Sequence, residues 1–152
     1  MPDQAGLDPA RLHVGWTEDG WQLTYDLSYL HPDWGQLIQT YQVISQDYEG
    51  QYIYESSFAL YKRGERVGSS FASYPKPLKA ELWKVIFAVK RRFFEEIEPD
   101  IVTHFIKQEH SVEQRYQLYA KYLNLPEYEL VRSNHDFTYF RLPAANAGRV
   151  AG

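Results

Sequence analysis

The segment from Leu78 to Leu142 constrains the fold of this chain more than any other part of it. Apolar residues recur at its start with helical spacing, which predicts a long amphipathic helix. A short apolar strand, a second helix and two closing strands follow. These elements are expected at 78–97, at 101–106, from 111, at 128–131 and at 137–142. Such alternation of helices and strands predicts a mixed or parallel sheet with helices packed on it.

Before this segment, apolar and polar residues alternate with the period typical of half-buried strands. The first two strands flank Asp19-Gly20, a dipeptide that predicts a type I′ hairpin turn. The strands are expected around 12–16, 21–25, 41–45, 52–60 and 67–73. The stretch 29–39 is ambiguous and is compatible with a short helix capped by Asp33. The predicted fold class is therefore α+β, with an antiparallel N-terminal meander followed by helix, strand, helix and strand.

Both helices have identifiable ends. Pro77 suits the first turn of the long helix, and Glu98-Pro99 ends it because a residue before proline avoids the helical region. The second helix is expected to open on a capping box at Ser111 to Gln114, in which the Ser111 hydroxyl accepts a hydrogen bond from a backbone N–H.

Composition and charge exclude several classes of protein for this chain. The chain has 152 residues, 44% of them hydrophobic, so we expect one domain over 11–142 with flexible tails at 1–10 and 143–152. It has no cysteine, which excludes disulfides and thiolate metal sites. No apolar run approaches the ~20 residues of a membrane span, and the N-terminus lacks the apolar core of a signal peptide. We therefore expect a cytoplasmic protein without membrane association, and the net charge of −4 makes nucleic acid an unlikely partner.

Tyrosine is unusually abundant, with 13 residues in a chain that is 16% aromatic. Its ring favours half-buried strands, and its hydroxyl favours surfaces that are partly dry and partly wet. Two interpretations follow: tyrosines that reflect β-propensity on half-buried strands, or a tyrosine-rich face that binds a protein partner or a second copy of the chain.

The order of elements resembles the GNAT fold of N-acetyltransferases, in which a meander leads into a long helix, a strand, a second helix and closing strands. More narrowly, Glu98-Pro99-Asp100, the apolar strand 101–106, and Ser111 followed by Gln114-Arg115 and Leu118-Tyr119 resemble small phage and prophage proteins of that fold. In the resembling fold the strand before the long helix lies beside the strand after it. Here these two strands are Arg66–Tyr74 and 101–106.

The resemblance also implies a cofactor site. In active members, a glycine-rich loop at the start of the long helix binds the pyrophosphate of acetyl-CoA or another acyl-CoA. The corresponding residues here include Ser73, Tyr74, Lys76 and Lys79, which would hold the cofactor if it binds. However, this loop has no glycine, and its two prolines remove N–H donors. On this ground we expect no cofactor.

Two side chains are candidates for acid–base chemistry. Tyr119 matches the tyrosine that many such enzymes use as general acid, and its alternative role is packing on the sheet. Glu55 lies on a strand of the meander and could act as general base, although a lone strand carboxylate is usually solvated. The histidines lack the spacing of metal ligands, so we expect no metal site. The basic residues of the long helix, among them Lys90, are interspersed with acidic ones and suggest a solvated face.

Two hypotheses result, and whether the chain is an enzyme stays open between them. The first is a non-catalytic or degenerate acetyltransferase-like domain of phage or prophage type that binds a protein partner. The second is an acyl-CoA-dependent N-acyltransferase in which Tyr119 is the general acid.

Overall fold

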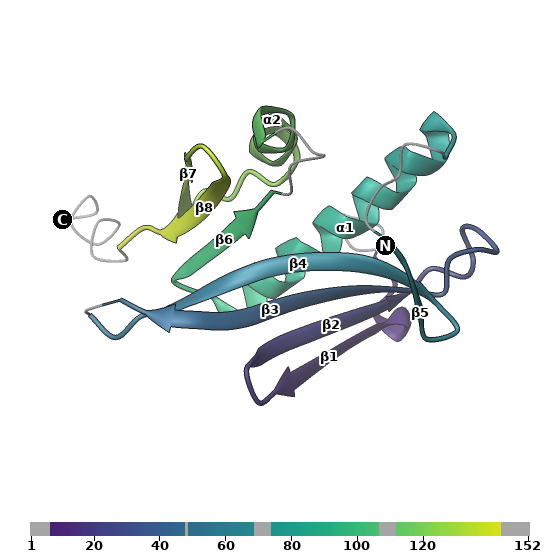
Figure 1. Cartoon of the computed structure of the whole chain (residues 1–152), viewed down its shortest axis with the longest axis horizontal. Coiled ribbons are helices and arrows are strands. Elements are labelled where there is room, and N and C mark those ends of the chain that lie inside the picture. Colours follow the sequence, from purple (N-terminus) through teal and green to yellow (C-terminus); the bar gives the residue numbers. More distant parts are fainter. Residues whose placement is uncertain (1–6, 48, 69–73, 107–111, 144–152) are drawn as a thin grey trace. The chain divides into compact units, whose positions relative to one another are not determined.

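In the residues that it describes, the computed structural model contains eight strands and two α-helices, which confirms the α+β class with a mixed sheet (Figure 1). It describes residues 7–47, 49–68, 74–106 and 112–143. Along the chain the elements are a 3₁₀ turn η1 (Pro9–Arg11), β1 (Leu12–Thr17), β2 (Gly20–Asp26), β3 (Gln36–Gln46), β4 (Tyr52–Lys62), β5 (Glu65–Gly68), α1 (Lys76–Ile97), β6 (Ile101–Phe105), α2 (Val112–Tyr122), β7 (Tyr128–Arg132) and β8 (Asp136–Arg141).

The strands follow the order β1-β2-β3-β4-β6-β8-β7, and β5 pairs with β4 outside this path. The pair β4 and β6 is parallel, and it is this pair that makes the sheet mixed. The chain divides into two compact units. Unit 1 is Met1–Gln42 with Ser56–Glu98, and unit 2 is Val43–Glu55 with Pro99–Gly152. Strands β3 and β4 each contribute residues to both.

In unit 1, β1 and β2 form the predicted hairpin, but the turn lies one residue earlier than expected. Thr17 pairs with Gly20, so the loop residues are Glu18 and Asp19. Neither of these two has a positive φ, and the turn is therefore not type I′. Gly20 instead opens β2 with φ of 153°, and a Cβ there would lie 2.0 Å from the carbonyl oxygen of Tyr41. Glycine is thus required by close approach of β3 as well as by its backbone angle.

The long helix α1 forms as predicted and begins slightly earlier, at Lys76. Its C-cap, Glu98, adopts a left-handed conformation with φ of 51° and donates its N–H to the Phe94 carbonyl, because Pro99 prevents a further helical turn. The predicted apolar face is buried. The buried residues of the helix are Leu82, Val85, Ile86, Phe87, Ala88, Val89, Lys90, Phe93 and Phe94. The stretch from Val85 to Lys90 is thus buried all round the helix, which places Lys90 in the interior rather than on the expected solvated face.

The stretch 27–35 forms turns and contains no helix, so the possible helix capped by Asp33 is absent. Asp33 instead pairs with Lys62 at 3.3 Å, and its N–H donates to Nδ1 of His31. Gly35 donates its N–H to the Tyr61 carbonyl at 2.8 Å, which joins this loop to the end of β4. Ahead of β1, Leu7 is buried and η1 is formed, so this end of the expected tail is structured.

In unit 2, β6 lies between two strands, as its apolar sequence predicted. It is parallel to β4 over Ile53–Glu55 and antiparallel to β8. The neighbour of β6 is thus β4, and not the strand that directly precedes the long helix. Of that strand the structure describes β5, which pairs antiparallel with β4 over Leu60–Lys62, and residues 69–73 of the predicted strand lie outside the described residues. The closing strands β7 and β8 form an antiparallel hairpin, and α2 packs against β8. The expected capping residue Ser111 lies outside the described residues.

Candidate functional site

Tyr119, the candidate general acid, lies in the interior of unit 2. Its side chain is 2% exposed, and its ring centroid is 4.9 Å from His104 and 4.7 Å from Phe137. Burial raises the pKa of the Tyr119 phenol well above its ordinary value, and the nearby Arg115 charge offsets only part of this effect. A buried phenol with a raised pKa is a weaker proton donor than a free one. The geometry therefore favours the packing role of Tyr119.

Glu55, the candidate general base, lies on the opposite face of the same sheet. It pairs with Thr103 in the parallel register, so these two side chains share a face. His104 follows Thr103 and contacts Tyr119, which places α2 on the other face. The sheet thus separates Glu55 from Tyr119, and the structure does not bring the two candidate catalytic residues together.

Three of the four candidate cofactor residues are described, and they surround the start of α1. The ring of Tyr74 packs against Trp34 and His31 at centroid distances of 5.0 and 5.4 Å. The backbone N–H of Lys79 donates to the carbonyl of Pro75, which is the N-cap residue of α1. Pro75 makes no side-chain capping hydrogen bond. Lys76 and Lys79 place positive charge at this helix end, where an anion is favoured. Ser73 lies outside the described residues.

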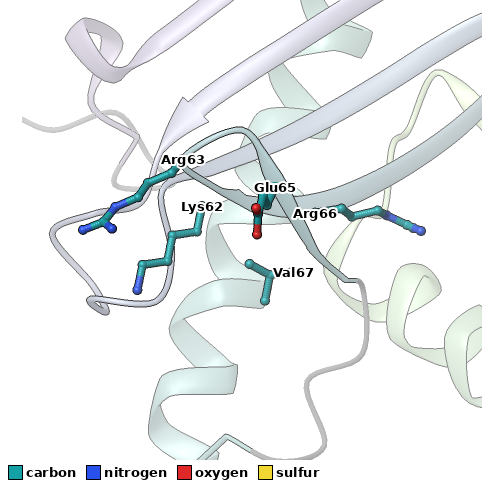
Figure 2. A pocket seen from close by; sticks show the side chains of 5 residues that line it. All are labelled: Lys62, Arg63, Glu65, Arg66 and Val67. Atoms are coloured by element: carbon teal, nitrogen blue, oxygen red, sulfur yellow. The ribbon is translucent and has the colours of Figure 1, made fainter.

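A hollow of about 370 Å³ lies at the β4–β5 hairpin, lined by Lys62, Arg63, Glu65, Arg66 and Val67. Arg63 and Gly64 both have positive φ, which makes the turn tight. Figure 2 shows the side chains of Lys62 and Arg63 directed to one side and that of Arg66 to the other. Lys62 is already paired with Asp33. Because the basic groups diverge, the hollow lacks the converging donors of a phosphate site.

Unit 2 exposes large apolar side chains on one face of its sheet. Phe105, Val131 and Phe140 are 51%, 42% and 40% exposed. The register pairs Phe140 with Ile101 and Val131 with Thr138, so all of these side chains point to one side. That side is opposite to α2. We call it the open sheet face, defined by Ile53, Glu55, Ile101, Thr103, Phe105, Glu129, Val131, Asp136, Thr138 and Phe140. Within it, Ile101 and Thr103 of β6 are buried.

The open sheet face carries charge of one sign. Its ionisable side chains are Glu55, Glu129 and Asp136. Within β6, β7, β8 and Ile53–Glu55, no lysine, arginine or histidine side chain points to this face. The two arginines of these strands, Arg132 and Arg141, point to the side of α2. At the middle of the face Thr138 donates a hydrogen bond to Thr103 over 2.9 Å, and the apolar and acidic side chains lie around this pair.

The described tyrosines are divided among buried, half-buried and exposed positions, and five of the chain's 13 are buried. Those buried are Tyr25, Tyr41, Tyr54, Tyr119 and Tyr139. The exposed ones, Tyr29, Tyr52 and Tyr122, belong to a turn, the start of β4 and the end of α2. The large exposed side chains that share a face are thus phenylalanine and valine. β6 is apolar on both sides and is buried on both, apart from Phe105 at its end, so its sequence did not indicate these exposed side chains.

The described residues contain no group of three histidine, aspartate or glutamate side chains placed to hold a metal ion. His104, beside the expected strand–helix loop, is 3% exposed and stacks on Phe137 at 4.9 Å. No helix in the described part of the chain is long and apolar enough to cross a membrane.

No protein-family model matches this sequence, and no curated protein matches it. The acetyltransferase-like assignment therefore stays a prediction from the order of elements and the residues quoted for it.

Proposed function

We propose that this chain is a non-catalytic, acetyltransferase-like domain of phage or prophage type that binds a protein partner through the open sheet face. The observation that carries the proposal is the exposure of Phe105, Val131 and Phe140 on one side of a sheet. Exposed large apolar side chains gathered on one face can mark an interaction site.

The charge of the face specifies the partner further. Because Glu55, Glu129 and Asp136 are all acidic, a second copy of the same face would bring like charges together. A partner with apolar side chains bordered by lysine or arginine would be complementary. Such a complex would form in the cytoplasm, that of the host if the protein is phage-encoded.

Matched peptides test this proposal. Two helical peptides would be labelled with fluorescein, both with leucine along one face, one with lysine and the other with glutamate along the opposite face. The lysine peptide should bind in fluorescence anisotropy, and its affinity should fall as salt is raised. The double variant Phe105→Ser/Phe140→Ser should weaken binding at least tenfold, whereas Trp16→Ser, at an exposed site in unit 1, should not.

Equal binding of the two peptides, or unchanged binding to the double variant, would contradict the proposal. Sedimentation equilibrium tests whether the chain forms a dimer. A concentration-dependent dimer that Phe140→Ser abolishes would show that the open sheet face binds a second copy of the chain instead of a basic partner.

The alternative is an acyl-CoA-dependent N-acyltransferase with Tyr119 as general acid and with Tyr74, Lys76 and Lys79 near the cofactor. Lys76 and Lys79 at the start of α1 are compatible with an anionic ligand. The burial of Tyr119 and its separation from Glu55 support the non-catalytic proposal instead.

A further inference from the structure

The hairpin of β1 and β2 carries two tryptophans at its end. Trp16 and Trp21 are paired directly across the two strands, and the next pair, Thr17 and Gly20, closes the hairpin. The two rings contact each other edge to face, with centroids 4.9 Å apart and planes inclined at 70°. Such a contact stabilises a hairpin, but it covers only part of each ring. Trp16 is 60% exposed, the largest fraction among the exposed large apolar side chains of the described residues.

The place of the pair in the sheet explains why one ring is open to solvent. β1 is the outermost strand in the described strand order, and β2 lies between β1 and β3. Trp21 therefore has Tyr41 of β3 on its inner side and Trp16 on its outer side. Tyr41 is buried beneath α1, where its ring stacks on Phe93. The apolar layer under the helix thus ends in the two tryptophans, and no described strand lies beyond Trp16.

The hairpin is acidic around these rings. From Leu12 to Asp26 the sequence contains three carboxylates, no lysine and no arginine. Two of the carboxylates, Glu18 and Asp19, form the turn and are exposed, and each lies two residues from a tryptophan. Two residues of chain span at most ~7 Å, which is within the Debye length of ~8 Å at physiological ionic strength. The negative charge of the turn therefore acts on the surroundings of both rings.

Two other exposed aromatic rings already hold a cation of the chain itself. The guanidinium of Arg11 lies 4.3 Å from the ring centroid of Tyr29, and the amine of Lys121 lies 5.1 Å from that of Tyr122. In the described part of the chain, no lysine or arginine is placed over either tryptophan of the hairpin. Indole is nevertheless the side chain that binds cations best. An exposed indole beside an acidic turn thus favours a cation from outside the chain.

We infer that the corner between the rings of Trp16 and Trp21 binds a soluble quaternary ammonium cation such as choline, with the turn carboxylates as its counter-charge. Two inclined rings suit a rounded cation, because its methyl groups can contact both ring surfaces, whereas a planar guanidinium stacks on one ring. A quaternary nitrogen has no N–H to satisfy, so ring surfaces and nearby charge suffice. The corner lies in unit 1 and the open sheet face in unit 2, so this inference goes beyond the proposed partner binding and does not depend on it.

Titration of choline into the ¹⁵N-labelled full chain tests the inference, because each of the four indole N–H groups gives its own NMR signal. Ionic strength is held constant with sodium chloride. The signals of Trp16 and Trp21 should shift saturably, with a Kd on the order of 10 mM for a surface site. Those of Trp34 and Trp83 should stay in place and serve as reporters of an intact fold. The neutral alcohol 3,3-dimethylbutanol has the shape of choline without its charge and should bind at least fivefold more weakly.

Variants separate the contribution of the rings from that of the charge. Trp16→Leu keeps an apolar side chain but removes the open indole, and it should abolish the choline-dependent shift of Trp21. Glu18→Gln/Asp19→Asn should weaken choline binding at least threefold. Glu65→Gln, at the exposed start of β5, should leave binding unchanged. Unchanged reporter signals show that each variant is folded.

Equal binding of choline and the neutral alcohol would overturn the inference, since the corner would then be merely apolar. Absence of a saturable shift, or a shift that persists in Trp16→Leu, would overturn it as well. Tighter binding of methylguanidinium than of choline would replace the quaternary ammonium by an arginine side chain. A chain that pellets with phosphatidylcholine vesicles but does not bind free choline would place the cation in a lipid headgroup and overturn the soluble ligand.

Discussion

The side-chain amine of Lys90 donates a hydrogen bond to Oγ of Ser56 over 2.7 Å, in the buried layer between α1 and β4. Lys90 is 0% and Ser56 5% exposed. The amine also lies 5.4 Å from the ring centroid of Tyr41 and 5.8 Å from that of Phe58. A buried amine is costly unless hydrogen bonds and aromatic faces compensate its lost hydration. These partners explain how a lysine is accommodated among apolar neighbours.

Removal of the hydroxyl partner should therefore destabilise unit 1. Ser56→Ala is expected to lower the free energy of unfolding by about 1–3 kcal/mol, since the buried amine loses an acceptor. Lys90→Met, which removes the amine but keeps the volume, should change it by less than about 1.5 kcal/mol. Urea unfolding measures both, with Ser57→Ala at the exposed neighbouring position as control. A larger loss for Lys90→Met than for Ser56→Ala would show that the amine itself stabilises the fold.

The core under α1 depends on the contact between Phe93 and Tyr41. Their rings stack at a centroid distance of 3.6 Å, and both side chains are buried. Phe93→Ala should cost about 3–5 kcal/mol through the cavity it leaves. Phe105→Ala, at a side chain that is 51% exposed, should cost much less. Urea unfolding of the two variants would refute the assigned core if Phe93→Ala lost under about 1 kcal/mol.

Gly20 should be the least replaceable glycine of unit 1. Residues with a side chain rarely adopt its φ of 153°. In addition, an added Cβ would lie 2.0 Å from the Tyr41 carbonyl oxygen. Gly20→Ala is expected to lower stability by about 2–4 kcal/mol. Gly50, with φ of 85° and nothing within 4 Å of such a Cβ, is the matched control. Gly50→Ala retains only the strain of a left-handed residue, about 1–2 kcal/mol. Thermal unfolding should rank the two variants in this order, and the reverse ranking would contradict the assigned approach of β3.

The burial of Tyr119 should make the free energy of unfolding depend on pH in the alkaline range. Its pKa is raised in the folded protein, so its contribution is fully present below the pKa of the unfolded state, about 10, and is lost as pH rises towards the folded value. Wild-type protein should lose stability above pH ~10 more steeply than Tyr119→Phe. Urea unfolding at neutral and alkaline pH measures the difference, with Tyr122→Phe at a half-exposed site as control. Parallel pH profiles for wild type and Tyr119→Phe would contradict the burial of this phenol.

The periodic elements could be predicted from the sequence because local patterns determine them. The face of α1 from Leu82 to Phe93 and the alternation in β4 each reflect burial of one side of an element. The predicted turn before Gly20 is wrong by one residue because the demand for glycine comes from Tyr41, which is distant in sequence. The predicted solvation of Lys90 is wrong for the same reason, since its acceptor Ser56 lies on another element.

The candidate site was less predictable than the fold. Residue types identified Tyr119 and Glu55 as chemically capable, but only strand register shows that they lie on opposite faces of the sheet. The open sheet face was also missed, because no local sequence pattern connects its exposed side chains. Its exposed side chains come from β6, β7 and β8, and only their pairing brings them together.

Isothermal titration calorimetry with acetyl-CoA and with CoA tests most directly the central proposal, that this chain is not an acyl-CoA-dependent enzyme. We predict no saturable heat for either ligand at concentrations up to about 1 mM, equivalent to a binding free energy weaker than about −4 kcal/mol. Saturable binding with a Kd below about 100 µM, or about −5.5 kcal/mol, that is lost in Lys76→Ala/Lys79→Ala would contradict the account and favour the acyltransferase.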